Sequence, residues 1–368
     1  MNEQRQEQLS RIVIKGFKSI KDCEVDLKNI NVLIGANGAG KSNLVSVFNL
    51  LNSVLEQELS LYVGRHGLSS LLYNGLKSTD CIRMEFEFKS ISYLFELVPT
   101  ADNRLVFKHE ILLDKKSSSP RYFLQGHPES LGKNRVFIND VEVEREFIFS
   151  EQNLFKTYHF HDTGMHSRIK EEHNISNCAV FINDARNLAA YLYRLKQHFP
   201  KEYADILSAI RLVAPFFDDF VLEPRELNNE QIVLRWLKKG CVDIFNASQL
   251  SDGTLRFICL ATLLLQPIQL QPSTIIIDEP ELGIHPFAIA ILAEMLQKAA
   301  VHKQIIIATQ SVELLDKFDV DDVIVVDNEE NGSTFRRLER EQLKYWLENE
   351  YSLGDLWNKN VLGGRFSR

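Results

Sequence analysis

Hydrophobic and polar residues follow different rhythms in different parts of the chain. In residues 81–88 every second residue is apolar and charged residues stand between them, which is typical of a strand with one buried face. Similar short apolar segments follow, separated by turn-rich breaks, at residues 93–98, 105–113, 121–124 and 135–138. We therefore predict an antiparallel sheet over residues 80–160, inserted into, or laid across, the lobe that precedes it.

The second half of the chain changes to helical spacing. Apolar residues recur every three to four positions through a helical segment predicted over 185–215, with a break at Pro200 and no heptad array. Three short strands are expected at 220–222, 232–236 and 242–245. Residues 274–326 then alternate apolar strands with helices, which predicts a parallel sheet covered by helices.

The N-terminal part contains a glycine-rich stretch between a strand and a helix. Strands are predicted at 12–17 and 23–27, and a short buried strand at 32–34; residues 61–79 are loop-rich and receive no assignment. Residues 35–42 match G-x-x-x-x-G-K-[ST], and apolar residues at helical spacing follow to Leu55. Such a loop lets backbone N–H groups surround phosphate oxygens at a helix N-terminus. A plain glycine-rich turn is disfavoured because strand and helix stand on the correct sides.

The loop supplies most of the expected nucleotide ligands. Lys41 is placed to reach the β- and γ-phosphates, and the Ser42 hydroxyl to ligate Mg²⁺. The residues assigned to nucleotide binding here are Asn37, Gly38, Ala39, Gly40, Lys41, Ser42 and Asn43.

A second stretch, I-I-I-D-E-P-E at 275–281, brings two adjacent carboxylates to the end of an apolar strand, where α/β proteins place their ligands. Asp278 is expected to hold Mg²⁺, directly or through water, and Glu279 to polarise the attacking water during γ-phosphate hydrolysis. Alone, this run is more often a solvated turn. Together with the phosphate loop it predicts a catalytic carboxylate pair.

A third stretch, L-S-D-G-T-L-R at 250–256, opens an apolar helix. Ser251 and Gly253, with Thr254 beside them, present hydroxyls and backbone N–H groups at the helix N-terminus, which is an anion site. An ordinary serine or aspartate N-cap is the commoner meaning of such a segment.

Taken together, these three stretches and A-T-Q-S near residue 310 resemble ABC-type ATPase heads. The likeness is to the RecF/SMC-like group, specifically the compact "predicted ATPases" without transporter domains, several of which serve in anti-phage defence. Further similar segments are I-K-G-F-K-S-I near the start, Y-H-F-H-D-T at 158–163, residues 185–196, and the ending L-W-N-K-N-V-L-G-G-R-F.

The resemblance implies a fold: an α/β P-loop ATPase head of the ABC type, with a parallel sheet core, an added antiparallel β lobe and a helical lobe. The expected organisation is a flexible tail over 1–10, one bilobal head over 11–335 and a C-terminal helical tail over 336–368. Within the head, residues 80–160 form the β insertion, 185–215 the helical segment, and 246–330 the lobe with the signature and the carboxylate pair.

It also implies a head-to-tail homodimer in which ATP on one protomer is capped by Ser251 and Gly253 of the other. Lys41, Ser42, Asp278 and Glu279 would act within their own chain. Gln310 stands where such heads usually have a switch histidine, and glutamine cannot take a positive charge. Hydrolysis is therefore expected to be slow. Lys18 is a further candidate nucleotide contact.

Composition narrows these expectations. The 368 residues carry a net charge of −8, which disfavours non-specific nucleic-acid binding by the whole surface but leaves a local basic groove open. The five cysteines are scattered with no C-x-x-C pair, as in a protein with reduced thiols. The polar N-terminus has no signal-peptide core, and the longest apolar run, at 257–265, is too short for a bilayer. We expect a cytoplasmic protein without membrane contact.

Two histidine groups are weaker candidates. His159, His161 and Asp162 resemble a metal cluster, although an H-x-H-D segment at a strand end is more often structural. His285 is expected to pack near the dimer seam and not to bind a metal.

Three functions remain open from the sequence. The first is a sensing or regulatory ATPase that uses ATP and Mg²⁺ to control an effector partner, such as a nuclease or toxin, in anti-phage defence. The second is a RecF-like recombination or repair ATPase with DNA as a partner. The third is the ATPase subunit of a transporter, disfavoured by the inserted sheet.

Overall fold

The computed structural model of the chain describes residues 8–115, 119–122, 126–130, 137–138, 141–142, 155–225 and 228–364. The chain forms two compact units. Unit 1 consists of Met1–Lys156 and Asp319–Arg368, and unit 2 of Thr157–Phe318. The phosphate loop therefore belongs to unit 1, and both the carboxylate pair and the signature stretch belong to unit 2.

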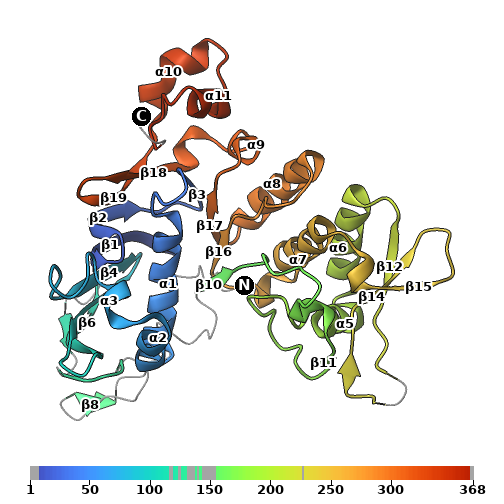
Figure 1. Cartoon of the computed structure of the whole chain (residues 1–368), viewed down its shortest axis with the longest axis horizontal. Helices are drawn as coiled ribbons and strands as arrows, with labels where there is room; N and C mark the ends of the chain where they lie inside the picture. Colours follow the sequence, from blue (N-terminus) through green and yellow to red (C-terminus); the bar gives the residue numbers. More distant parts are fainter. Residues whose placement is uncertain are drawn as a thin grey trace. The chain divides into compact units, whose positions relative to one another are not determined.

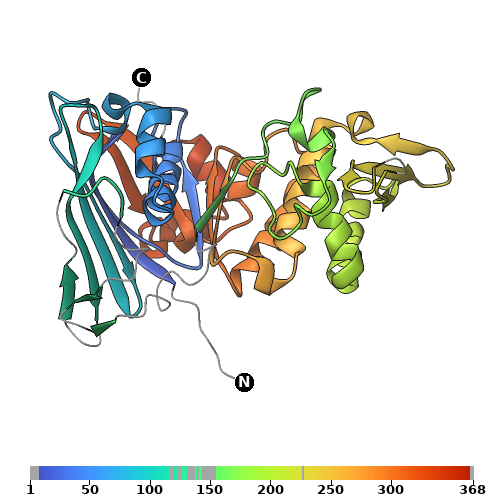
Figure 2. The same cartoon turned by 90° about the horizontal axis from the view of Figure 1, so that it is seen from below.

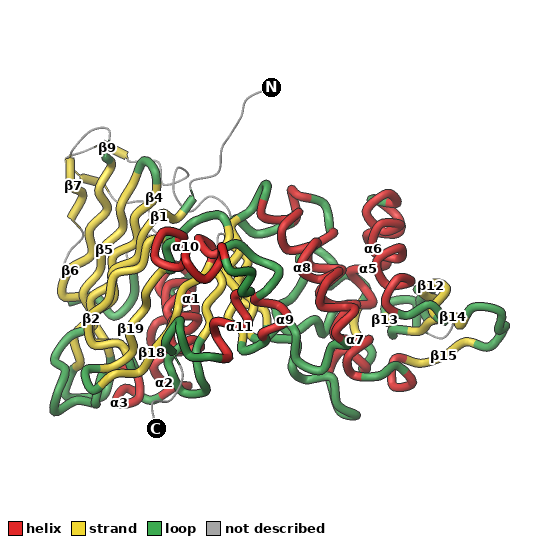
Figure 3. Tube along the Cα trace, turned by 90° about the horizontal axis from the view of Figure 1, so that it is seen from above, coloured by secondary structure: helices red, strands yellow, loops and turns green. Residues whose placement is uncertain are grey.

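A six-stranded antiparallel sheet forms one layer of unit 1, in the order β2-β1-β4-β5-β6-β7. Its strands are β1 (Leu9–Phe17), β2 (Ile20–Asp26), β4 (Ile82–Phe88), β5 (Ile91–Pro99), β6 (Leu105–Asp114) and β7 (Ser119–Tyr122). The alternation in 81–88 is confirmed, because the apolar residues of β4 are buried and the charged ones half-buried. Figures 2 and 3 show the long strands side by side.

The sheet is more than an insertion over 80–160. β1 pairs with both β2 and β4, so strands near the N-terminus and the later strands form one layer. Of the other predicted strands, β8 (Phe137–Ile138) pairs with β9 (Val141–Glu142), and residues 123–124 and 135–136 lie outside the described residues.

The phosphate loop of unit 1 is carried by a second group of strands. β3 (Ile30–Ile34) pairs in parallel with β18 (Val323–Glu329), which pairs antiparallel with β19 (Gly332–Arg337). Helix α1 (Lys41–Leu55) follows the loop. β19 lies beside β2, which connects this group to the antiparallel sheet (Figure 1).

Three boundaries in unit 1 differ from expectation. Leu9 is fully buried and begins β1, so the predicted tail over 1–10 is too long by two residues; residues 1–7 are not among the described ones. Residues 61–79, left unassigned, include most of α2 (Leu59–His66) and all of α3 (Leu68–Leu71). The C-terminal helices, α10 (Arg340–Glu348) and α11 (Leu353–Asn358), begin only after β19 ends.

Unit 2 contains the predicted alternation of strands and helices. β16 (Thr274–Asp278) and β17 (Gln304–Thr309) are parallel neighbours in register, with Asp278 opposite Ala308. The helices are α5 (Leu188–His198), α6 (Pro200–Val213), α7 (Asp252–Leu265), α8 (Pro286–Ala300) and α9 (Val312–Leu315). Figure 3 shows α5 to α8 as neighbouring helices. Of these, α5 and α6 lie within the segment predicted as helical over 185–215.

Short strands complete unit 2. β12 (Phe217–Val221), β14 (Arg235–Lys238) and β15 (Ile244–Asn246) form one small sheet, and β11 (His173–Asn174) pairs with β13 (Gln231–Ile232). The division of the chain into the two units falls within β10 (Phe155–Tyr158), between Lys156 and Thr157. None of the helices described here is long and apolar enough to cross a bilayer.

Candidate nucleotide-binding site

The phosphate loop of unit 1 ends in a tight glycine turn. Gly40 caps α1 with a φ of 118°, in the left-handed region, and no acidic residue occupies the first turn of the helix. A Cβ on Gly40 would come within 2.1 Å of Ser333 Oγ, so only glycine fits. The helix N-terminus therefore keeps its partial positive charge beside exposed backbone of the loop.

Lys41 is buried and lies over this loop. Its Nζ donates to the carbonyl oxygens of Gly35 at 2.6 Å and Ala36 at 3.0 Å. The ammonium is thus held close to the helix N-terminus, where two sources of positive potential combine. Ser42 follows in the first turn of α1 and is exposed, and a hydroxyl oxygen is a ligand type that suits a hard cation.

A chain of hydroxyl groups braces the loop from two other elements. Ser333 Oγ donates to the Ala39 carbonyl at 2.7 Å and lies 2.7 Å from Ser19 Oγ. The Asn43 side-chain amide donates to Ser19 Oγ at 2.6 Å. Nothing in the sequence indicated a role for Ser333, which lies on β19. Its hydroxyl occupies the space that a side chain at position 40 would need.

Lys18 lies beside α1. Its Nζ donates to Ser46 Oγ at 2.8 Å, one turn after Ser42, whose carbonyl accepts from the same Ser46 hydroxyl. Burial lowers the pKa of Lys18. A nucleotide contact by Lys18 remains a prediction.

The carboxylate pair of unit 2 stands at the carboxyl end of β16. Glu279 has a φ of 47°, a left-handed conformation that is unfavourable for a side chain with a Cβ. Its N–H donates to the Ala308 carbonyl at 2.7 Å, and its Oε1 accepts from the Gln310 side-chain amide at 2.5 Å. The structure therefore brings Asp278, Glu279 and Gln310 together at adjacent strand ends.

Glu281 joins the two strand ends and was given no role by the sequence. Its Oε1 accepts from Thr309 Oγ1 at 2.6 Å and from the Gln310 N–H at 3.1 Å. Burial raises the pKa of this carboxyl group, against the lowering effect of those hydrogen bonds. Glu281 therefore holds the backbone of Gln310, whose side chain contacts Glu279. The available signal was the second glutamate of D-E-P-E together with the threonine of A-T-Q-S.

The raised pKa of Glu281 predicts a pH-dependent stability difference. The folded state binds the proton more tightly than the unfolded chain, so the stability contributed by this group is present below pH 4.5 and is lost as pH rises through the folded pKa. Glu281→Gln has no such titration. As the pH rises through that window, the urea midpoint of the variant should therefore increase relative to that of the wild type. A constant difference between the two midpoints at all pH values would contradict the assignment.

The signature stretch begins α7 as an N-cap. Exposed Ser251 accepts from the Thr254 N–H at 3.2 Å, and its Oγ lies 2.8 Å from Thr254 Oγ1. A Cβ on Gly253 would come within 2.2 Å of the Gly283 carbonyl oxygen. Glycine is therefore required here so that α7 can approach the loop after the carboxylate pair.

Arg256 connects α7 to the segment at 158–163. The buried guanidinium donates from Nε to the Phe160 carbonyl at 2.8 Å and from Nη2 to the His161 carbonyl at 3.2 Å. Burial lowers the pKa of His159, and the nearby Asp278 carboxylate raises it. Within the described residues, no group of three potential ligands is placed to hold a metal ion. Arg256 thus holds the backbone of the H-x-H-D segment through two carbonyl oxygens, and a structural role for its histidine side chains stays a prediction.

His285 caps α8, because its Nδ1 accepts from the Phe287 N–H at 3.2 Å. Its predicted place at a dimer seam stays a prediction.

The oxygen donors expected for Mg²⁺ are the Ser42 hydroxyl and the Asp278 carboxylate. Both are of the type that this hard cation prefers.

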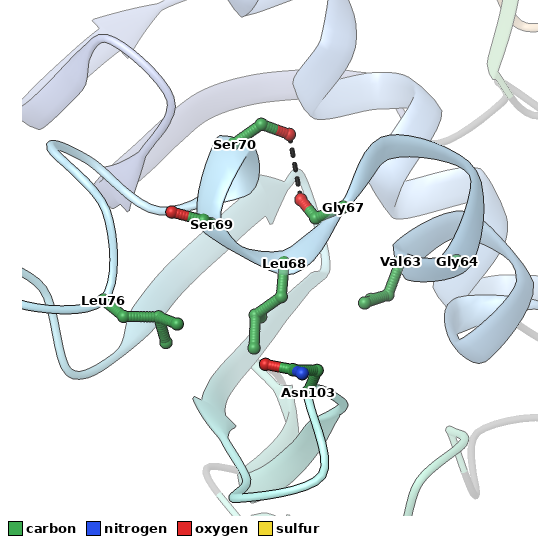
Figure 4. Close-up of a pocket in the computed structure, with 8 residues that line it drawn as sticks. All are labelled: Val63, Gly64, Gly67, Leu68, Ser69, Ser70, Leu76 and Asn103. Carbon is green, nitrogen blue, oxygen red and sulfur yellow. Dashed lines mark hydrogen bonds between the residues drawn. The ribbon is translucent and has the colours of Figure 1, made fainter.

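A pocket of about 530 Å³ elsewhere in unit 1 does not contribute to the site. It lies between the α2–α3 region and the turn between β5 and β6, and Figure 4 shows Leu68, Leu76 and Asn103 beside it. Its lining residues are Val63, Gly64, Gly67, Leu68, Ser69, Ser70, Leu76 and Asn103. None of them is titratable.

Comparison with known proteins identifies one family. Residues 30–316 match the model of the family described as "AAA domain, putative AbiEii toxin, Type IV TA system". The chain is also 24% identical over 377 aligned residues to the Old nuclease of Escherichia phage P2. That alignment covers 91% of this chain and 62% of the nuclease, so the chain spans less than two thirds of the length of this relative.

Two structures of SMC heads share the fold. One is an SMC head bound to the C-winged helix domain of ScpA, with a TM-score of 0.57, 15% identity, and coverage of 92% of this chain and 99% of that one. The other is an Smc head with an extended coiled coil bound to the C-terminal domain of ScpA derived from Pyrococcus furiosus, with a TM-score of 0.53, 15% identity, and coverage of 94% and 100%. The predicted ABC-type fold is therefore confirmed.

Proposed function

We infer the function of this chain from the premise that it belongs to the AbiEii-type AAA domain family: it binds ATP with Mg²⁺ and hydrolyses it to ADP and phosphate. The observation that carries this inference is the phosphate loop, in which Gly40 fits against Ser333 and the Lys41 ammonium lies at the N-terminus of α1. Such an arrangement suits a triphosphate.

The residues divide the work of hydrolysis. Lys41 and the loop amides would hold the β- and γ-phosphates, while Ser42 and Asp278 would hold Mg²⁺, which neutralises charge on the phosphates when bound. Glu279 would orient and deprotonate the attacking water. Gln310, which donates to Glu279, would hold this carboxylate and cannot itself accept a proton.

The exposed signature supports a head-to-tail homodimer. Ser251 is exposed, and it stands with Thr254 at the N-terminus of the 14-residue helix α7. The N-terminus of a helix can bind phosphate oxygens through its backbone N–H groups and its partial positive charge. We propose that it does so in trans, capping the ATP held by Lys41 of a second copy.

The proposed biological role is control of an effector in anti-phage defence. The family description names a toxin and a toxin–antitoxin system, and a relative is a nuclease. ATP-driven closure of the dimer would change the state of a partner nuclease or toxin. The likeness to SMC heads concerns the fold and identifies no partner.

Crosslinking between two differently tagged chains tests the shared site. One chain carries Asn37→Cys and the other Asp252→Cys; both positions are exposed and neither replaces Lys41 or Ser251. Because each chain has only one introduced cysteine, a product that contains both tags joins different protomers. We expect this product with ATP and Mg²⁺, and at least about 10-fold less without nucleotide, since ATP holds the two surfaces together.

The same pair in a Lys41→Ala background is the matched control and should give no ATP-dependent product. Unmodified chains measure crosslinking through the native cysteines. A mixed product whose yield is the same with and without ATP would argue against a nucleotide-dependent dimer.

A further inference from the structure

Gly364, within the chain segment at 352–364, contacts the phosphate loop. The carbonyl oxygen of Gly364 accepts from the Ala36 N–H at 2.9 Å. The carbonyl oxygen of Ala36 in turn accepts from the Ala39 N–H at 3.2 Å and from Lys41 Nζ at 3.0 Å. Both polar groups of Ala36 are therefore engaged, one by the segment and the other by the loop and its lysine.

The segment is firmly attached to unit 1. The Gly364 N–H donates at 3.1 Å to Oδ2 of Asp327, which lies on β18, and Arg336 on β19 donates to the Leu362 carbonyl at 2.6 Å. Leu362 and Trp357 are buried. β18 is also the parallel neighbour of β3, so the strand that precedes the loop and the segment that contacts the loop share one support.

Two adjacent glycines differ in how much space surrounds them. Gly363 and Gly364 both have a φ of +78°, so a side chain at either position meets the same backbone strain. A Cβ on Gly364 would lie 2.8 Å from Val325 Cγ1 and 3.0 Å from the Trp357 ring. A Cβ on Gly363 would approach no atom closer than 3.7 Å, the distance to Arg336 Nη2. The pair provides an internal control.

We propose that residues 352–364 are a positioning element of the nucleotide site. The Gly364 carbonyl orients Ala36, and Ala36 places the Lys41 ammonium over the loop. The consequence for ATP rests on the function proposed above; the hydrogen bond to Ala36 does not. The segment is not proposed to contact the phosphates; it would affect ATP binding by holding the loop in position.

Gly364→Ala and Gly363→Ala are compared with wild type for the KM of ATP, kcat, thermal unfolding and amide exchange at Ala36. Gly364→Ala should raise KM about 10-fold, leave kcat within about 2-fold, and speed exchange at Ala36 about 10-fold, because binding is weakened while the carboxylate pair is untouched. Gly363→Ala should show only the loss of stability that comes from backbone strain, and it should leave KM and the exchange rate at Ala36 near wild type.

Asp327 gives a second route that does not depend on packing. Asp327→Ala removes the acceptor for the Gly364 N–H and should raise KM and exchange in the same direction, whereas Asp327→Asn retains an acceptor oxygen and should restore both. This pair decides the question if Gly364→Ala fails to fold.

The outcomes separate the two proposals. A wild-type protein that binds no ATP overturns the proposed function, while faster exchange at Ala36 in Gly364→Ala still supports the contact. A wild-type protein that binds ATP, with KM and Ala36 exchange unchanged in both Gly364→Ala and Asp327→Ala, overturns the positioning role. Equal rises in KM for Gly363→Ala and Gly364→Ala overturn it too, because strain alone would then explain them.

Discussion

Replacing Glu279 by glutamine should leave ATP binding intact and slow hydrolysis by about 100-fold or more, the size expected when a positioned general base is lost. Glu279 is held by two contacts, from its N–H to Ala308 and from Gln310 to its carboxylate. Glutamine matches its shape, so the loss falls on proton transfer. Single-turnover measurement of phosphate release from bound ATP isolates that step.

Glu294→Gln is the matched control for this substitution. Glu294 is exposed on α8, so the same change of charge and shape is made away from the carboxylate pair, and turnover should stay within about 2-fold of wild type, as for an ordinary surface substitution. Normal turnover in Glu279→Gln would remove Glu279 from its proposed role. Loss of ATP binding there would show that the carboxylate acts in the ground state instead.

The parts of the site that the sequence predicted well are contiguous in the chain. The strand expected at 32–34 is the end of β3, and the helix expected after the loop is α1, which starts at Lys41 and ends at Leu55. The same is true of β16 with its terminal carboxylates. In each case a run of apolar residues and the polar residues directly after it contain all the information, because the geometry is local.

The contacts that the sequence did not reveal join residues far apart in the chain. Ser333 reaches Ala39 across 294 positions, and Glu281 reaches Thr309 across 28. Neither residue type is unusual at its position, and a single sequence contains no record of pairing. The hydroxyl of Ser333 can reach the Ala39 carbonyl only because position 40 has no side chain.

Strand pairing was underdetermined for the same reason. The alternation in β4 predicts a half-buried strand but does not say that β1 is its neighbour. The missing assignment for residues 61–79 has a different cause. Gly64 and Gly67 suggest turns, yet Leu59, Tyr62 and Val63 are buried on one face of α2, so tertiary packing outweighs the low helix propensity of glycine.

Lys41→Ala should weaken the binding of a fluorescent ATP analogue by about 100-fold or more. The ammonium is held over the loop by the Gly35 and Ala36 carbonyls at the N-terminus of α1, so its removal takes away the one full positive charge that the loop itself supplies to the phosphates. Losing a charged hydrogen-bonding partner typically costs about 1.5–3 kcal/mol, and the poorly compensated phosphate charge adds to it.

The control for Lys41→Ala is the other lysine near the loop. Lys18 donates to Ser46 on the side of α1, and Lys18→Ala removes a charge of the same sign without emptying the loop. If Lys18→Ala leaves affinity within about 2-fold of wild type while Lys41→Ala abolishes binding, the charge acts from Lys41 and the expected contact of Lys18 with the nucleotide is wrong. If affinity is unchanged in a folded Lys41→Ala protein, residues 35–42 are a glycine-rich turn and not a phosphate loop.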